Sequence, residues 1–108
     1  MASSIQILTD DNFDKTINDL ETPVLIDFFA PWCGPCRAMR PLLEELSGEM
    51  QGKLSFAKIN VDENQDTPTK LKIRSIPCLI LFRQGEELGR LVGHKGKQAL
   101  QSELEKLL

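Results

Sequence analysis

Two cysteines three positions apart, Cys33 and Cys36, are the residues whose types and spacing most directly predict chemistry. Residues at this spacing lie on one side of a helix, so a helix beginning here would let the two sulfurs close into a small-ring disulfide. Cys33 would then stand at the helix N-terminus, where unpaired N–H groups and the helix dipole favour a thiolate over a thiol. We therefore expect Cys33 to be the nucleophile and Cys36, deeper and less exposed, to resolve the mixed disulfide.

The two residues between the cysteines suit thiol–disulfide exchange. Gly34 lets the backbone approach a partner closely, because it has no side chain. Pro35 fixes φ in the first helical turn, where its missing N–H costs nothing. The spacer is therefore expected to stiffen the disulfide ring.

Two other interpretations of the cysteine pair have to be weighed. A zinc site would need four ligands, and the chain could supply Cys33, Cys36, Cys78 and His94. However, fifteen residues separate Cys78 from His94, where a zinc knuckle has about two to five. A purely structural disulfide is the second interpretation, but a Cys-x-x-Cys pair near a βαβ pattern is typical of redox chemistry. The redox interpretation is favoured over both.

Asp27 interrupts the otherwise apolar run 24–30, which predicts a central strand covered on both faces. A carboxylate there is desolvated, which raises its pKa unless it is paired. The strand leads directly to the cysteines, so Asp27 could lie beneath the helix that carries Cys36 and exchange a proton with it. The residues alone leave a second role for Asp27 equally open, in which it only forms a hydrogen bond with a nearby backbone group or pairs with Lys58. Without such a partner, Lys58 is expected to lie at a solvated edge of the sheet.

The elements that must position these residues follow from periodicity and from turn signals. Pro41 falls inside the long helix and predicts a kink there. The expected order is β-α-β-α-β-α-β-β-α, an α/β fold with a central mixed sheet flanked by helices on both faces. The expected strands are 5–8, 24–30, 54–61, 78–82 and 87–92, and the expected helices are 13–20, 33–48 with a possible extension to 52, 67–72 and 95–108.

Length and composition restrict the function classes. The 108 residues are 41% hydrophobic and 27% charged, as expected for a single domain, residues 1–108, with a core of its own. A net charge of −3 with interspersed signs argues against nucleic-acid or membrane partners. The sequence shows no signal peptide or membrane span, so a cytoplasmic location is expected, although a removed organelle-targeting segment would leave no trace. It also shows no nucleotide-binding fingerprint, so electrons must arrive through another protein.

The sequence resembles the thioredoxin family from about Phe13 to the C-terminal helix. Several motifs occur in register, which makes a chance match very improbable. They are the stretch 27–37, with Trp32-Cys33-Gly34-Pro35-Cys36 at its centre, and then 60–64, 73–77, 82–85 and 92–93. The resemblance implies the thioredoxin fold, with Cys33–Cys36 as its redox-active disulfide.

The resemblance also implies roles that the residues alone do not give. Asp27 would be the buried acid that assists Cys36, with Lys58 beside it to tune its proton affinity. Pro77 would follow a cis peptide bond and lie against the disulfide. Ile76 would offer its backbone to an extended substrate segment.

An apolar rim around Cys33 is a further implication of the resemblance. It would be formed by Trp32, Pro35, Ile76 and Gly93, and a shallow apolar patch of this kind suits many protein substrates. The Gly-Pro spacer resembles that of the reducing members of the family.

The implied activity is that of a cofactor-free protein-disulfide reductase that carries electrons in cell redox homeostasis. Its partners would be disulfide-containing proteins and a thioredoxin reductase, either an NADPH-dependent flavoprotein or a ferredoxin-dependent enzyme, and the protein would be a monomer. The alternative is a binding subunit of a larger assembly in which the thiols are not essential.

Two positions depart from the pattern of the family. Cys78 follows Pro77 where threonine is common, and Phe29 stands where many members have tryptophan. Core packing is the expected role of both. The alternative for Cys78 is oxidation or glutathionylation that regulates the nearby site.

Overall fold

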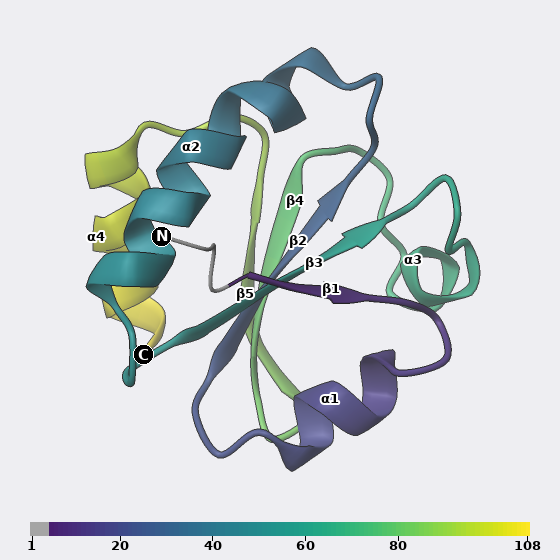
Figure 1. Cartoon of the computed structure of the whole chain (residues 1–108), viewed down its shortest axis with the longest axis horizontal. Helices are drawn as coiled ribbons and strands as arrows, with labels where there is room; N and C mark the ends of the chain where they lie inside the picture. The colour runs from purple at the N-terminus through teal and green to yellow at the C-terminus, as the bar shows by residue number, and fades with distance from the viewer. Residues whose placement is uncertain (1–4) are drawn as a thin grey trace.

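The computed structural model describes residues 5–108 of the chain (Figure 1). The order of the elements is β-α-β-α-β-α-β-β-α, which confirms the expected fold class. The elements are β1 (Gln6–Leu8), α1 (Phe13–Asp19), β2 (Val24–Phe29), α2 (Gly34–Glu49), β3 (Ser55–Asn60), α3 (Asp66–Lys70), β4 (Cys78–Arg83), β5 (Glu86–Val92) and α4 (Lys97–Leu107).

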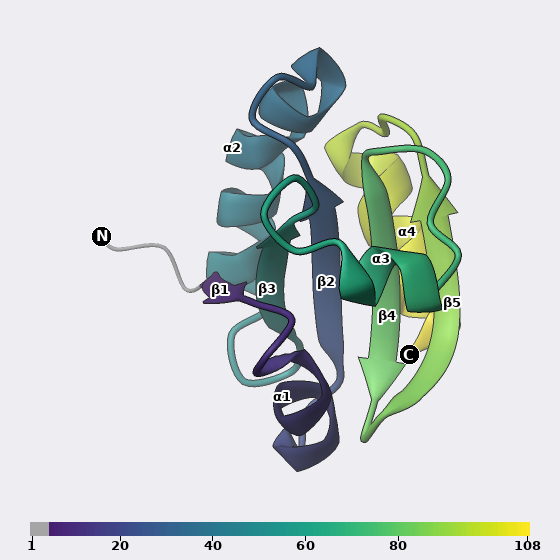
Figure 2. The ribbon, with the colours of Figure 1, turned by 90° about the vertical axis from the view of Figure 1, so that its right-hand side faces the viewer.

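One five-stranded sheet, in the order β1-β3-β2-β4-β5, forms the centre of the molecule. β3 lies parallel to both β1 and β2, whereas β4 is antiparallel to β2 and to β5, so the sheet is mixed. Figures 1 and 2 show helices on both faces of the sheet, with α2 and α4 on one side and α1 and α3 on the other.

Strand β2 contributes to both hydrophobic cores because its side chains alternate between the two faces. Leu25 packs with α2 and α4, whereas Ile26 and Phe28 pack with α1 on the opposite face. This two-sided burial explains the nearly unbroken apolar run of the strand. By the same alternation Asp27 shares the face of Leu25 and lies under α2, where the site is built.

Helix α3 differs from the helix expected at 67–72. It begins at Asp66 because the carboxylate of Asp10, far away in the sequence, accepts hydrogen bonds from the backbone N–H groups of Asp66 and Thr67 at 3.2 and 2.9 Å. It ends at Lys70, and Lys72 then adopts a left-handed backbone conformation with φ of 57° that a helix cannot continue.

The remaining boundaries lie close to those expected. Helix α2 ends at Glu49, between the two ends expected from the sequence. The helix continues through Pro41. α4 begins two residues later than expected, at Lys97. Between β4 and β5, Gln84 and Gly85 both have positive φ, as a tight two-residue hairpin turn requires.

Candidate active site

The cysteine pair lies where β2 gives way to α2. Cys33 is the N-cap residue of α2, and a disulfide joins it to Cys36 in the first turn. The backbone N–H of Cys36 donates a hydrogen bond to Cys33 Sγ at 3.2 Å. Gly34 and Pro35 are the first two helical residues, as the spacer predicts. The Cys33 sulfur is therefore held at the positive end of a 16-residue helix.

The expected difference in exposure between the two cysteines is wrong. Only 4% of Cys33 and 5% of Cys36 is exposed, so both are buried to the same extent. The reason is that the two residues pack with Ala30 into one small cluster, against which Phe29 and Ile76 also pack. Cys36 differs from Cys33 in that it also lines a cavity on the inner side of α2.

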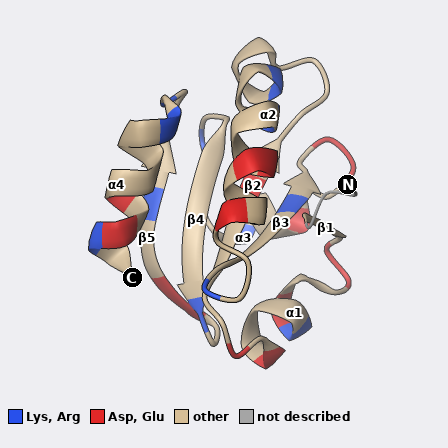
Figure 3. Cartoon of the chain, turned by 60° about the vertical axis from the view of Figure 1, so that its left-hand side comes forward, with Lys and Arg blue, Asp and Glu red and all other residues tan. Residues whose placement is uncertain are grey.

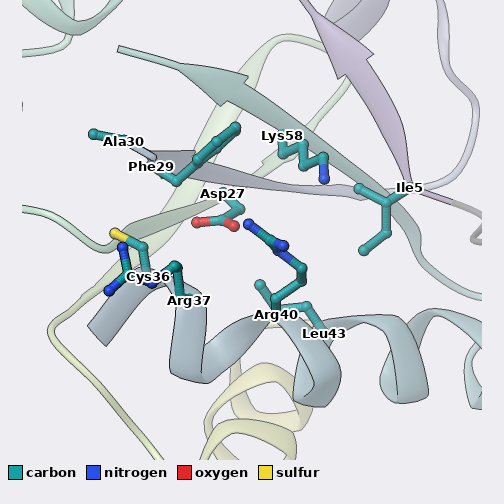
Figure 4. Close-up of a pocket in the computed structure, with 9 residues that line it drawn as sticks. All are labelled: Ile5, Asp27, Phe29, Ala30, Cys36, Arg37, Arg40, Leu43 and Lys58. Atoms are coloured by element: carbon teal, nitrogen blue, oxygen red, sulfur yellow. The ribbon is translucent and has the colours of Figure 1, made fainter. Parts of the chain in front are cut away.

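This inner cavity contains the carboxyl group of Asp27. It has a volume of about 20 Å³ and is lined by Asp27, Cys36 and Lys58, and by further residues of α2 (Figure 4). Asp27 Oδ1 is fully buried and has no hydrogen-bond partner among the described residues. An oxygen in this position has lost its hydrogen bonds to water and gained none from the protein, so the ionised form of the carboxyl group is unfavourable in free energy. The strand thus places a buried carboxyl group in the same cavity as Cys36.

Burial raises the pKa of Asp27 to about 7, while the positive charges of Lys58 and Arg40 act in the opposite direction. Asp27 and Lys58 are paired in register across β2 and β3. Lys58 Nζ lies 5.6 Å from the centre of the Phe29 ring, a cation–π distance. Lys58 therefore belongs to the site and not to a solvated edge. A carboxyl group with this pKa can accept and release a proton near neutral pH.

Of the rim residues implied by the resemblance, Ile76 packs against the cysteine cluster and lines a groove together with Trp32. Trp32 is 67% exposed, and its Nε1–H donates a hydrogen bond to Asp62 Oδ2 at 2.9 Å. The Ile76–Pro77 peptide bond is cis, and Pro77 O accepts a hydrogen bond from the N–H of Gly93 at 2.9 Å. Gly93 has φ of +89°, a conformation that favours glycine.

A groove of about 220 Å³ opens beside this rim. Its walls are mostly apolar and include Trp32, Val61, Ile73 and Ile76. Val61 and Ile76 also pack against the cysteine cluster, so the groove runs up to the disulfide. A groove of this depth can receive an apolar side chain of a substrate chain that approaches Cys33.

The four residues considered as zinc ligands do not come together. Cys78 is 2% exposed and packs with the core on the α1 face, whereas His94 is exposed. Across residues 5–108, no three His, Cys, Asp or Glu side chains are grouped as a metal site requires. Burial also raises the pKa of the Cys78 thiol. These facts fit a packing role for Cys78, because reactive cysteines are accessible thiolates.

Arg40 and Asp62 belong to the site but were not identified from the sequence. Arg40 follows Cys36 by four residues, and this spacing alone places it on the same side of the helix. Asp62 contacts Trp32 across a sequence distance of thirty residues, for which the sequence carries no local signal.

A disulfide at a helix N-terminus above a buried acid, carried by a mixed α/β sheet, defines a thiol–disulfide oxidoreductase. The family model described as Thioredoxin matches residues 4–106, and the chain belongs to the thioredoxin family. Members of this family exchange electrons with a reductase and with disulfide-containing proteins, and the cysteine pair has the arrangement that this activity needs.

Several named relatives are similar over most of the chain. A thioredoxin of Synechocystis is 44% identical over 108 residues, covering all of both chains. Thioredoxin C-2 of Corynebacterium nephridii is 47% identical over 93 residues, 86% of each chain. The chloroplastic M-type thioredoxin of Pisum sativum is 42% identical over 106 residues, which are 98% of this chain and 62% of the pea protein. These likenesses favour dithiol–disulfide exchange over a binding subunit with non-essential thiols.

None of the helices within residues 5–108 is both long enough and apolar enough to cross a membrane.

Proposed function

We propose that this protein is a general protein-disulfide reductase in which Cys33 attacks the substrate, Cys36 resolves the mixed disulfide and Asp27 accepts the proton of Cys36. The observation that carries this assignment is the shared cavity of Asp27 and Cys36 beneath the N-terminal turn of α2. The cavity supports this proposal because Asp27 and Cys36 both line it, while a separate apolar groove reaches the cysteine cluster through Val61 and Ile76.

The reaction begins with the reduced cysteine pair. The Cys33 thiolate attacks one sulfur of a substrate disulfide, whose S–S bond breaks as the new bond to Cys33 forms. One substrate sulfur leaves as a thiolate and takes a proton from the solvent. The N-terminus of α2 and the N–H of Cys36 stabilise the attacking thiolate, because both present positive charge to Cys33 Sγ.

In the second step the Asp27 carboxylate accepts the proton of the Cys36 thiol, directly or through one water molecule, for which the cavity is large enough. The Cys36 thiolate attacks Cys33 Sγ and releases the second substrate sulfur as a thiolate. The Cys33–Cys36 disulfide forms, so the substrate has gained two electrons and the protein has lost two. A reductase must then return two electrons to the pair.

Substrate recognition combines the groove with backbone groups of the rim. Trp32, Pro35, Ile76 and Gly93 present the rim that an extended segment would cross, and Ile76 offers its backbone for strand-like pairing. Contacts of this kind depend little on the side chains of the substrate segment, which suits a reductase with many protein substrates.

The wider setting is also a proposal. The protein acts as one domain and as a monomer, carries electrons in the redox homeostasis of the cytoplasm, and receives them from an NADPH-dependent flavoprotein reductase. A ferredoxin-dependent reductase is the alternative donor, and the named relatives, one chloroplastic and two bacterial, are compatible with either. Reduction assays with a purified reductase of each class distinguish the donors, and light scattering gives the mass in solution.

The test is the reduction of insulin with dithiothreitol as the electron source. The native protein should raise the rate by at least about 10-fold, and Cys33→Ser should abolish the increase because the attacking thiolate of Cys33 is missing. Cys78→Ala is the matched control, since it removes a cysteine outside the pair and should keep the activity. A native protein that adds nothing to the rate of dithiothreitol alone would contradict the proposal.

Trapping tests the two cysteine roles separately. Cys36→Ser should accumulate a mixed disulfide between Cys33 and a disulfide substrate, visible as an added mass, because the resolving thiol is missing. Cys33→Ser should accumulate none. If the adduct instead formed on Cys36, the assigned roles would have to be exchanged.

A further inference from the structure

Arg40 lies on α2 four residues after Cys36 and lines the same small cavity. Figure 4 shows its guanidinium directed from α2 toward the Asp27 carboxylate, with the Cys36 sulfur on the other side of that carboxylate. The residue is exposed overall, so its charge remains hydrated at the mouth of the cavity while it faces a buried acid. The positive charge of Arg40 therefore acts on Asp27 across the cavity, without a direct salt bridge between the two side chains.

Three other elements carry the remaining charged or titratable groups near Asp27. Lys58 on β3 lies over the Phe29 ring. The Cys78 thiol lies on the neighbouring strand β4, but it packs on the opposite face of the sheet, in the core against α1. Arg37 also lines the cavity from α2, but its Nη1 donates a hydrogen bond to Pro31 O at 2.9 Å. Ile5 also lines this cavity. Within residues 5–108, Lys58 and Arg40 are therefore the cations whose positive charges lower the pKa of this carboxyl group.

We propose that Arg40 is a positioning residue that stabilises the ionised form of Asp27 and so sets the pH range in which Cys36 can resolve the mixed disulfide. The inference rests on the proposed role of Asp27. Arginine suits this place because it remains charged at every physiological pH, and because its long side chain lets the guanidinium face the cavity from an exposed position on α2. Asp27 Oδ1 is buried and has no hydrogen-bond partner among residues 5–108, so nearby positive charges are what favour the ionised form of this carboxyl group.

The first measurement is the carboxyl ¹³C shift of Asp27 in the oxidised protein, titrated between about pH 5 and 9. The cysteine pair does not titrate in the disulfide form, so the signal reports Asp27 alone. Arg40→Gln should raise the Asp27 pKa from about 7 by roughly 0.5 to 1. Lys53→Gln removes one positive charge at an exposed position outside the cavity and should leave this titration unchanged. Equal titrations for the native protein and Arg40→Gln would overturn the inference.

The second measurement is the rate of insulin reduction at pH 7 and at pH 9. Arg40→Gln should be slower than the native protein by about two- to five-fold at pH 7, because a smaller fraction of Asp27 is ionised, and nearly equal to it at pH 9. Arg40→Lys should recover most of the rate, since it keeps a positive charge on a shorter arm. A loss that is the same at both pH values would indicate a structural defect and overturn the inference.

A double variant separates action through Asp27 from action on the cysteines. In an Asp27→Asn background, Arg40→Gln should cause no further change of the pH profile. A further change there would mean that Arg40 acts on Cys33 or Cys36 directly and would overturn the inference. Failure of the proposed function itself looks different, because the native protein would then not reduce insulin at either pH.

Discussion

Two aspartates in this molecule, Asp10 and Asp27, experience opposite surroundings. Both oxygens of Asp10 accept hydrogen bonds, from the backbone N–H groups of Asp66 and Thr67 at the start of α3. At Asp27, Oδ1 is buried and has no hydrogen-bond partner among residues 5–108. Asp10 completes a helix end, whereas Asp27 remains available for chemistry.

The pKa values of the two groups follow from these surroundings. Burial would raise the pKa of Asp10, but the hydrogen bonds from Thr67 and Asp66 and the charge of Lys70 outweigh it and lower the pKa. At Asp27 burial outweighs the charges of Lys58 and Arg40, and the pKa rises to about 7. Depth of burial and hydrogen-bond donors therefore act together on the pKa of a carboxyl group in this fold, because Asp10 accepts two backbone hydrogen bonds and Asp27 Oδ1 accepts none among residues 5–108.

The largest expected effect is that of Asp27→Asn on the free energy of unfolding. The folded-state pKa of Asp27, about 7, lies above the usual 3.8, so between these values the folded state binds more protons and stability falls as pH rises. Asp27→Asn removes this loss and should raise the free energy of unfolding by about 2–4 kcal/mol at pH 8, and by little at pH 4. Urea unfolding of the oxidised protein at both pH values measures the difference. Equal gains at both pH values would contradict the role of ionisation.

The same substitution should impair exchange. Without the carboxylate, the Cys36 thiol must lose its proton to solvent, so Asp27→Asn should slow insulin reduction at pH 7 by at least about 10-fold. The loss should shrink at higher pH, where solvent removes the proton more readily. A variant that is more stable but equally active would show that Asp27 is not the proton acceptor.

Asp10→Ala should have a smaller effect and of the opposite sign. It leaves two backbone N–H groups of α3 without their acceptors and should lower the free energy of unfolding at pH 7 by about 1 kcal/mol. Because the pKa of Asp10 is lowered on folding, this contribution is present above the unfolded pKa and is lost as pH falls through the folded one. Thermal unfolding at pH 7 and pH 3 tests this, with Asp10→Asn, which keeps one acceptor, as the control. The rate of insulin reduction should stay within about two-fold of the native rate.

The smallest expected effect concerns Lys58. Its charge lowers the pKa of Asp27, so Lys58→Gln should raise that pKa further and slow insulin reduction at pH 7 by about three-fold. The comparison with Arg40→Gln ranks the two cations by their influence on one acid. The carboxyl ¹³C titration of Asp27 provides the measurement, and an unshifted titration in Lys58→Gln would leave Arg40 as the only effective cation.

The reactive half of the site could be predicted largely from local sequence. The spacing of Cys33 and Cys36 gives the disulfide and the helix N-terminus, because both depend on residues a few positions apart. Asp27 stands out because its polarity conflicts with the apolar strand around it. The cis bond before Pro77 could be expected only through the family resemblance, since most X-Pro bonds are trans.

The features that could not be predicted depend on contacts between distant segments. The start of α3 is fixed by Asp10, more than fifty positions earlier, so propensities near Thr67 placed it wrongly. The equal burial of Cys33 and Cys36 depends on Ile76, which the fold brings from another loop. Arg40 is the exception, because its spacing from Cys36 could have indicated it.

The position of Cys78 gives the molecule an internal probe of its own motions. Cys78 is 2% exposed and is paired in register with Phe28 on β2 and Val92 on β5, in the interior of the sheet. In the oxidised protein the other two cysteines are blocked by their disulfide, so a thiol reagent can label only Cys78. The rate at which a thiol reagent modifies Cys78 then measures how often the sheet opens locally next to the active site, and no cysteine has to be introduced for this measurement.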